Sequence, residues 1–150
     1  MNDAIKIYNI ETRETSTVSN RFGYQGSFHP NGRLFVFGTS DTHDVVLLDI
    51  ENGNSTVLGK GWTPHFSLNG EEIACARPGT NEVVFMSPFG SVLRTTKVND
   101  LYMLYGYGPS SKSLYVRLDG FERAGILDLV TGSVKELAFP VQDMMMPRDQ

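Results

Sequence analysis

The chain has 150 residues, of which 40% are hydrophobic and 20% charged, and its formal net charge is −4. This length and composition are typical of one globular domain with a sizeable core. Because the 13 basic residues are scattered through an acidic chain, we expect no nucleic acid and no membrane surface as a partner.

The compartment is inferred from the N-terminus and from the cysteine content. No apolar run approaches the ~20 residues of a membrane span. Residues 1–10 have neither a basic start nor a long apolar stretch, so we expect no secretory signal. The single cysteine, Cys75, excludes an internal disulfide and lies in an apolar run. We therefore expect a cytoplasmic protein in which Cys75 is a packed side chain.

The predicted elements begin with a hairpin over 4–18. A longer unit follows over 24–58, in which two apolar runs alternate with turns and a polar loop. Its turns contain Asn31-Gly32 and Asn52-Gly53, residue pairs that tolerate positive φ. Strand, turn and strand at this spacing predict a β-meander.

Internal repetition decides the architecture. Phe28, Phe66 and Tyr107 open three matching turns at spacings of 38 and 41 residues. Asp49 follows Asn9 by 40 residues, and Asp128 follows Asp49 by 79. A period near 40 with four strands per copy and no helical pattern predicts an all-β fold, a β-propeller. The predicted units are a half blade (4–18), three blades (24–58, 62–96 and 102–137) and a possible closing strand (139–145). A β-sandwich or jelly roll is the alternative.

Two short motifs support this interpretation. The turns HPNG at 29–32 and SLNG at 67–70 resemble the SPDG turn of TolB-like and WD-repeat propellers. Leu48-Asp49 and Leu127-Asp128 stand where a WD repeat has its Trp-Asp dipeptide, and TGS at 131–133 resembles the usual TGE turn. There is no Gly-His pair and no true Trp-Asp, so the resemblance implies a divergent propeller and no particular activity.

The number of hairpins leaves the closure of the ring open. A blade consists of a first hairpin, made of its first two strands, and a second hairpin, made of its last two. The sequence contains three first hairpins and four second hairpins, so it does not encode a whole number of blades. An open ring would expose an apolar blade face. Three closures are compatible with this count. The chain could close alone as a small four-bladed ring, two copies could join head-to-tail into a larger ring, or another protein could cap the open ends. We favour the homodimer.

The predicted binding face carries the loops between second and third strands and the connectors that enter each blade. Aromatic and arginine side chains, which dominate protein interfaces, gather there. Trp62 has two open interpretations, as a binding residue or as packing between blades. The candidate binding residues are Arg21, Tyr24, Asp41, His43, Lys60, Trp62, Arg77, Tyr102, Phe121 and Arg123.

Catalytic patterns are weak. The run Asp41-Thr42-His43-Asp44 resembles a metal or acid–base site, but consecutive loop residues seldom converge on one ion. Glu71 and Glu72 are adjacent on a predicted strand and would point to opposite faces. No G-x-S-x-G elbow and no phosphate loop occurs. We therefore predict no catalytic residue, no metal and no cofactor.

These observations predict a non-enzymatic module that binds a partner protein through its loops, as a scaffold or an inhibitor. The alternative function is a small propeller hydrolase or lyase with a channel site around His43.

Overall fold

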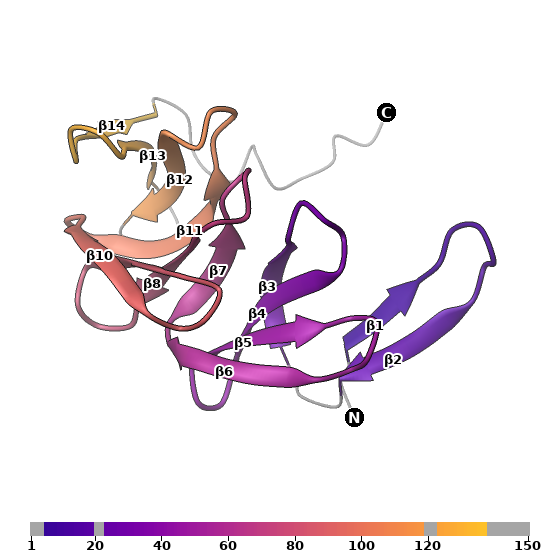
Figure 1. Ribbon diagram of the computed structural model, residues 1–150. Helices are drawn as coiled ribbons and strands as arrows, with labels where there is room; N and C mark the ends of the chain where they lie inside the picture. Colours follow the sequence, from indigo (N-terminus) through magenta and orange to yellow (C-terminus); the bar gives the residue numbers. More distant parts are fainter. Residues whose placement is uncertain (1–4, 20–22, 119–122, 138–150) are drawn as a thin grey trace.

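The computed structural model describes residues 5–19, 23–118 and 123–137, apart from the side chains of Val18, Ser19 and Tyr24. These residues form one two-stranded and three four-stranded antiparallel sheets, and the strands of each sheet pair in chain order (Figure 1). Within these ranges no helix is long and apolar enough to cross a membrane.

The four sheets follow one another along the chain. The hairpin consists of β1 (Ile5–Tyr8) and β2 (Thr15–Ser19). Blade one contains β3 (Gly23–Phe28), β4 (Leu34–Thr39), β5 (Asp44–Asp49) and β6 (Ser55–Lys60). Blade two contains β7 (Trp62–Phe66), β8 (Ile73–Arg77), β9 (Glu82–Met86) and β10 (Val92–Lys97). Blade three contains β11 (Leu101–Tyr107), β12 (Ser113–Leu118), β13 (Arg123–Asp128) and β14 (Val134–Glu136).

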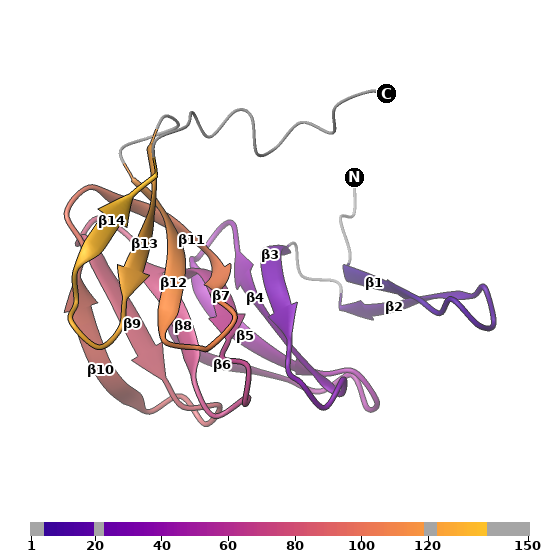
Figure 2. The same ribbon diagram turned by 90° about the horizontal axis from the view of Figure 1, so that it is seen from above.

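The sheets are arranged as propeller blades. In the two views, the blades fan out in an arc with β3, β7 and β11 toward its inner side, and the hairpin and blade three lie at opposite ends (Figures 1 and 2). The innermost strand β7 contacts β3 and β4 on one side and β11 on the other. The predicted all-β propeller fold is confirmed, and the two-layer sandwich is not observed.

The outer turns repeat the same geometry in the hairpin and in two blades. The side-chain oxygen Oδ1 of Asn9, Asp49 and Asp128 accepts the amide two residues later, at 2.9, 3.1 and 2.8 Å. The carbonyl of each of these three residues also accepts the amide four residues later, at 2.8 Å. The hairpin is therefore built like the third and fourth strands of a blade.

Successive side chains of a strand point to opposite faces of its sheet, so each blade packs against the sheets on both sides of it. Val36 on β4 packs toward blade two, whereas the next residue, Phe37, packs toward the hairpin together with Leu48 and Ile5. Cys75 is completely buried between blades one and two, and this burial raises the pKa of its thiol to about 12. A Cβ on Gly61 would lie 2.4 Å from the Cys75 sulfur, so the connector passes too closely for any other residue.

Hydroxyl groups join the innermost strands of neighbouring blades. The Ser27 Oγ accepts the Phe66 amide at 2.7 Å, and the Thr63 Oγ1 accepts the Leu104 amide at 2.9 Å. Thr63 is 1% exposed, so the Leu104 amide has no access to solvent at that contact. These bonds connect blade one to blade two and blade two to blade three.

We predict that Thr63→Val destabilises the protein by about 1–3 kcal/mol, because it leaves the buried Leu104 amide without its acceptor while keeping a β-branched shape. Urea unfolding followed by circular dichroism measures the change. The matched control is Thr56→Val on the exposed side of β6, which should shift stability by no more than about 0.5 kcal/mol. Equal effects of the two substitutions would contradict the role given to Thr63.

Candidate functional site

One end of the blades carries the β4–β5 and β8–β9 loops together with the β6–β7 and β10–β11 connectors, and we call it the loop face. The Gly61 amide donates to the His43 carbonyl at 2.8 Å, and the Val98 amide donates to the Asn81 carbonyl at 2.9 Å. His43 and Asn81 both have a φ of 55°. Loop and connector are thus held together in the same way in blades one and two.

Four predicted binding residues meet where the β4–β5 loop reaches the end of β6. Lys60 forms an ion pair with Asp44 at 2.6 Å, and its Nζ donates to the Thr42 carbonyl at 2.9 Å. The Asp41 carboxylate accepts the Thr42 amide at 2.8 Å, and the Thr42 hydroxyl donates to Asp44 at 2.6 Å. These contacts order the loop and fix it to β6. The four residues are Asp41, His43, Lys60 and Trp62.

His43 and Trp62 form an edge-to-face pair with ring centroids 4.9 Å apart. Within the described residues, His43 Nδ1 and Trp62 Nε1 are buried without a hydrogen-bond partner. Trp62 is half-buried and also packs against the apolar core between blades two and three. Of the two interpretations left open by the sequence, the structure supports packing between blades for Trp62.

The carboxylates near His43 serve the geometry of the loop. Asp41 and Asp44 bind Thr42 and Lys60, as described above. In the part of the chain that the structure describes, no group of three His, Cys, Asp or Glu side chains is arranged to hold a metal ion.

Each blade places a cation and a carboxylate at the loop face. Besides Lys60 and Asp44 in blade one, Arg77 pairs with Glu82 at 2.7 Å in blade two. In blade three, Arg123 pairs with Glu136 and lies 3.5 Å from Asp100 on the β10–β11 connector. The side chains of Lys60, Arg77 and Arg123 are 65%, 39% and 39% exposed, so these three cations are accessible to a partner.

A pocket of about 420 Å³ lies beside Arg123, between blade three and the β10–β11 connector. Polar side chains of blade three and of the β10–β11 connector line this pocket. They include positively and negatively charged groups. The charged and amide side chains that line it are Lys97, Asn99, Asp100, Arg123 and Glu136.

Tyr102, which the sequence placed in the connector that enters blade three, lies at the start of β11. It is 38% exposed, and the guanidinium of Arg117 lies 5.3 Å from its ring centroid. Leu114, Val116 and Leu118 pack toward blade two, so Arg117, which alternates with them, lies on the opposite side of blade three. Arg21, Phe121 and the side chain of Tyr24 lie outside the described residues.

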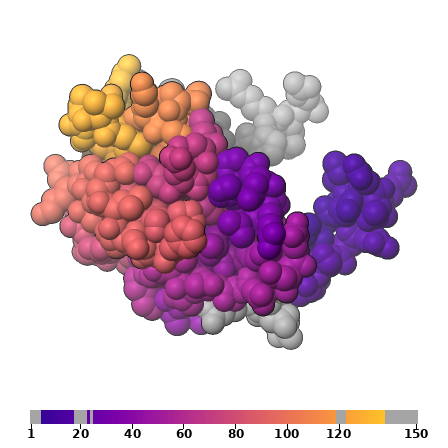
Figure 3. Space-filling model, viewed as in Figure 1, coloured from indigo at the N-terminus to yellow at the C-terminus, as the bar shows by residue number. Residues whose placement is uncertain are grey.

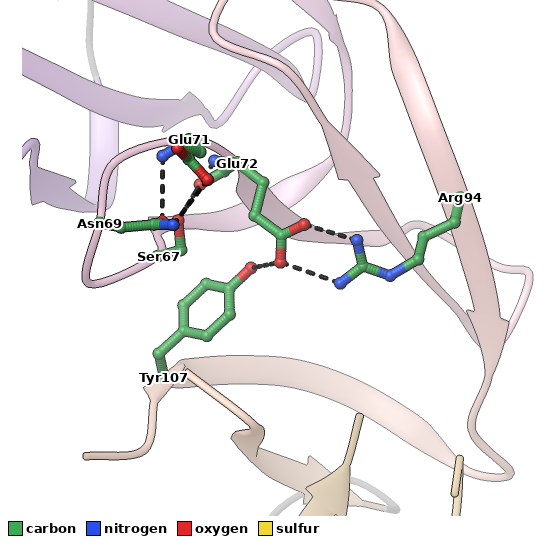
Figure 4. A network of polar contacts seen from close by, with 6 residues as sticks. All are labelled: Ser67, Asn69, Glu71, Glu72, Arg94 and Tyr107. Carbon is green, nitrogen blue, oxygen red and sulfur yellow. Dashed lines mark hydrogen bonds and ion pairs between the residues drawn. The ribbon is translucent and has the colours of Figure 1, made fainter. Parts of the chain in front are cut away.

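The sequence interpretation missed a polar network at the other end of the blades, which we call the turn face (Figure 4). Glu72 lies directly before β8 and outside any strand, whereas the sequence predicted it on a strand. Its carboxylate binds Arg94 through two contacts, at 2.5 and 2.9 Å, and accepts the Tyr107 hydroxyl at 2.8 Å. Because Tyr107 belongs to blade three, the network joins it to blade two.

The network sets the protonation of its members. Burial acts to raise the pKa of Glu72, but the hydrogen bonds from Arg94 and Tyr107 and the charge of Arg94 outweigh it, so the pKa lies below its ordinary value of 4.5. Burial, followed by the neighbouring Glu72 charge, raises the pKa of Tyr107. A second pocket of about 330 Å³ adjoins this network, lined in part by Ser67, Asn69 and Glu72.

Solved structures with the same fold are similar to this chain at low sequence identity. TolB from Acinetobacter baumannii aligns over 91% of the chain with a TM-score of 0.72 and 21% identity. A chain of a nidogen/laminin complex aligns over 91% with a TM-score of 0.73 and 11% identity. The WD40 repeats of RRP9 align over 77% with a TM-score of 0.58 and 11% identity.

The chain spans 37%, 56% and 38% of the lengths of these three structures, in the same order. No protein-family model matches the chain, and no curated protein does. Fold and comparisons together define a β-propeller unit. Its resemblance to TolB-like and WD-repeat propellers, predicted from the turns, is confirmed at the level of the fold.

We predict that Glu72→Gln lowers the free energy of unfolding at neutral pH. The difference in this free energy between the variant and the wild type should become smaller as the pH falls below 4.5. A carboxyl group with a lowered pKa contributes stability above its unfolded-state pKa and loses it on protonation. Urea unfolding of the variant and the wild type at pH 7 and at pH 3 measures this difference. Glu71→Gln is the exposed neighbouring control and should change little at either pH. A Glu72→Gln difference that is independent of pH would contradict this assignment.

Proposed function

We propose that this propeller is a non-enzymatic protein-binding module that holds a partner protein on its loop face, as a scaffold or an inhibitor. The observation that supports it is the repeated cation–carboxylate pair, one for each of the three blades, with exposed cations in Lys60, Arg77 and Arg123.

Such pairs suit recognition because they cost little to rearrange. An exposed ion pair contributes about 0–1 kcal/mol to stability, so a partner can replace one member without unfolding the blade. Complementary charges on the partner increase the association rate and select the correct orientation.

The pocket beside Arg123 supports a binding position for the proposed partner at this end of the blades. Its volume of about 420 Å³ accommodates a few side chains of a loop, and its lining offers Lys97 and Arg123 to carboxylates and Asp100 and Glu136 to cations. We therefore propose a partner with a protruding polar loop that carries both signs of charge.

Affinity capture from the cells that produce the protein, followed by quantitative mass spectrometry, tests this function. The double variant Arg77→Ala/Arg123→Ala should recover the partner at least about tenfold less well, as expected when interface arginines are removed. The matched control Arg33→Ala/Lys112→Ala removes two cations from the turn face and should recover the partner like the wild type. Retention by the first variant, or equal loss in the control, would contradict the proposal.

A further inference from the structure

The hairpin repeats the third and fourth strands of blade one residue by residue. Every pair between β1 and β2 becomes a pair between β5 and β6 when 40 is added to both residue numbers, for example Ile7–Ser16 and Leu47–Thr56. The register also shifts at the same point, after Ile5 in the hairpin and after Val45 in blade one. β1 therefore occupies the third-strand position of a blade, as β5 does.

The inner edge of β1 is open in the described part of the chain. In the three blades, the third strands β5, β9 and β13 pair with the second strand on one edge and with the fourth strand on the other. Within the described ranges, β1 pairs with β2 alone. The backbone groups on its other edge can therefore pair with a further strand.

The two faces of β1 require different side chains from such a strand. Ile5 and Ile7 are half-buried, and Ile5 packs with Phe37 of blade one. Lys6 and Tyr8, which alternate with them, are exposed. Residues directly opposite each other in an antiparallel pair share a face of the sheet. An added strand would therefore direct apolar side chains toward blade one and polar side chains to the other face.

Blade one presents an uncovered ring at the same place. Phe28 and Phe66 occupy the same position in consecutive blades, yet Phe28 is 55% exposed and Phe66 only 6%. Phe66 is covered by His29, from the inner turn of the preceding blade, with ring centroids 5.0 Å apart. The described residues contain no inner turn that could cover Phe28 in this way. In the space-filling view an open notch separates the hairpin from the body of the molecule (Figure 3).

The second strand of blade one shows what fits at this position. β4 runs antiparallel to β5 and directs Leu34 and Val36 toward the next blade. It follows the inner turn that carries His29. The equivalent occupant of the β1 edge is a turn followed by an extended segment that runs antiparallel to β1.

We propose that the open edge of β1 binds an extended segment of a partner protein, which adds the second strand of this blade. The segment has apolar side chains at alternate positions toward blade one, and the turn before it carries a ring that covers Phe28. Main-chain hydrogen bonds to β1 supply affinity, and the alternating side chains supply selectivity. This surface is separate from the loop face, so the inference does not depend on the function proposed for that face.

A synthetic peptide tests the proposal on the full chain. The probe is a fluorescein-labelled peptide with the sequence of residues 29–39, in which Phe35→Thr and Phe37→Thr make the outer face polar. Fluorescence anisotropy should show saturable binding to the wild type. A peptide that does not bind would overturn the proposal.

Methylation of selected peptide amides shows whether the probe binds as a strand. The Arg33 carbonyl accepts the Ile50 amide and the Leu34 carbonyl accepts the His29 amide, so backbone groups at positions 35 and 37 face the third strand. N-methylation at 35 and 37 should weaken binding at least about fivefold, because it removes two hydrogen bonds to β1. N-methylation at 34 and 36 is the matched control and should change binding no more than about twofold. Equal effects of the two modifications would overturn strand addition.

Hydrogen exchange and variants of the protein locate the peptide. On binding, β1 should take up deuterium more slowly, whereas the outer strands β6, β10 and β14 should be unchanged. Phe28→Asp should weaken binding at least about tenfold. Phe89→Asp, at a site 93% exposed on the β9–β10 turn, should bind like the wild type. Protection of the outer strands in place of β1 would overturn the proposal. If Phe28→Asp fails to fold, the methylated peptides decide on the wild type.

Light scattering separates a partner protein from a second copy of the chain. The mass of the protein should not change when the peptide is added, apart from the mass of the peptide. A fall from the mass of two chains to that of one would show that a second copy occupies the edge, and would overturn the assignment to a partner protein.

Discussion

The fold depends on hydroxyl groups that join each innermost strand to the next blade. Ser27 accepts the Phe66 amide, and Thr63 accepts the Leu104 amide. An innermost strand has one edge without a strand of its own sheet, and its buried amides require other acceptors. These bonds supply acceptors from neighbouring blades and connect the three sheets.

Two surface features follow from this arrangement. With the blades fixed side by side, their loops and connectors collect at one end, and the ion pairs of Lys60, Arg77 and Arg123 share one face. The same arrangement leaves the Phe28 side of blade one facing a hairpin that cannot cover it. The loop face thus presents exposed cations, and the Phe28 side presents an exposed aromatic ring.

The sequence predicts the blades well because local turn chemistry repeats with the fold. The equivalence of Asn9, Asp49 and Asp128 is visible in the spacing and is confirmed by their hydrogen bonds. The Glu72 network was missed because Arg94 and Tyr107 are 22 and 35 residues away in the chain, without a motif that connects them. The contact between Tyr102 and Arg117 was also not predicted, because it depends on how β11 pairs with β12 and no motif connects the two residues.

The most direct test of this account is native-state hydrogen exchange at the amides of Phe66 and Leu104. If hydroxyl acceptors connect the blades into one cooperative unit, both amides should exchange only through global unfolding, with the free energy measured in urea. Exchange of either amide through an opening of much lower free energy would show that the blades separate individually, and would contradict the account.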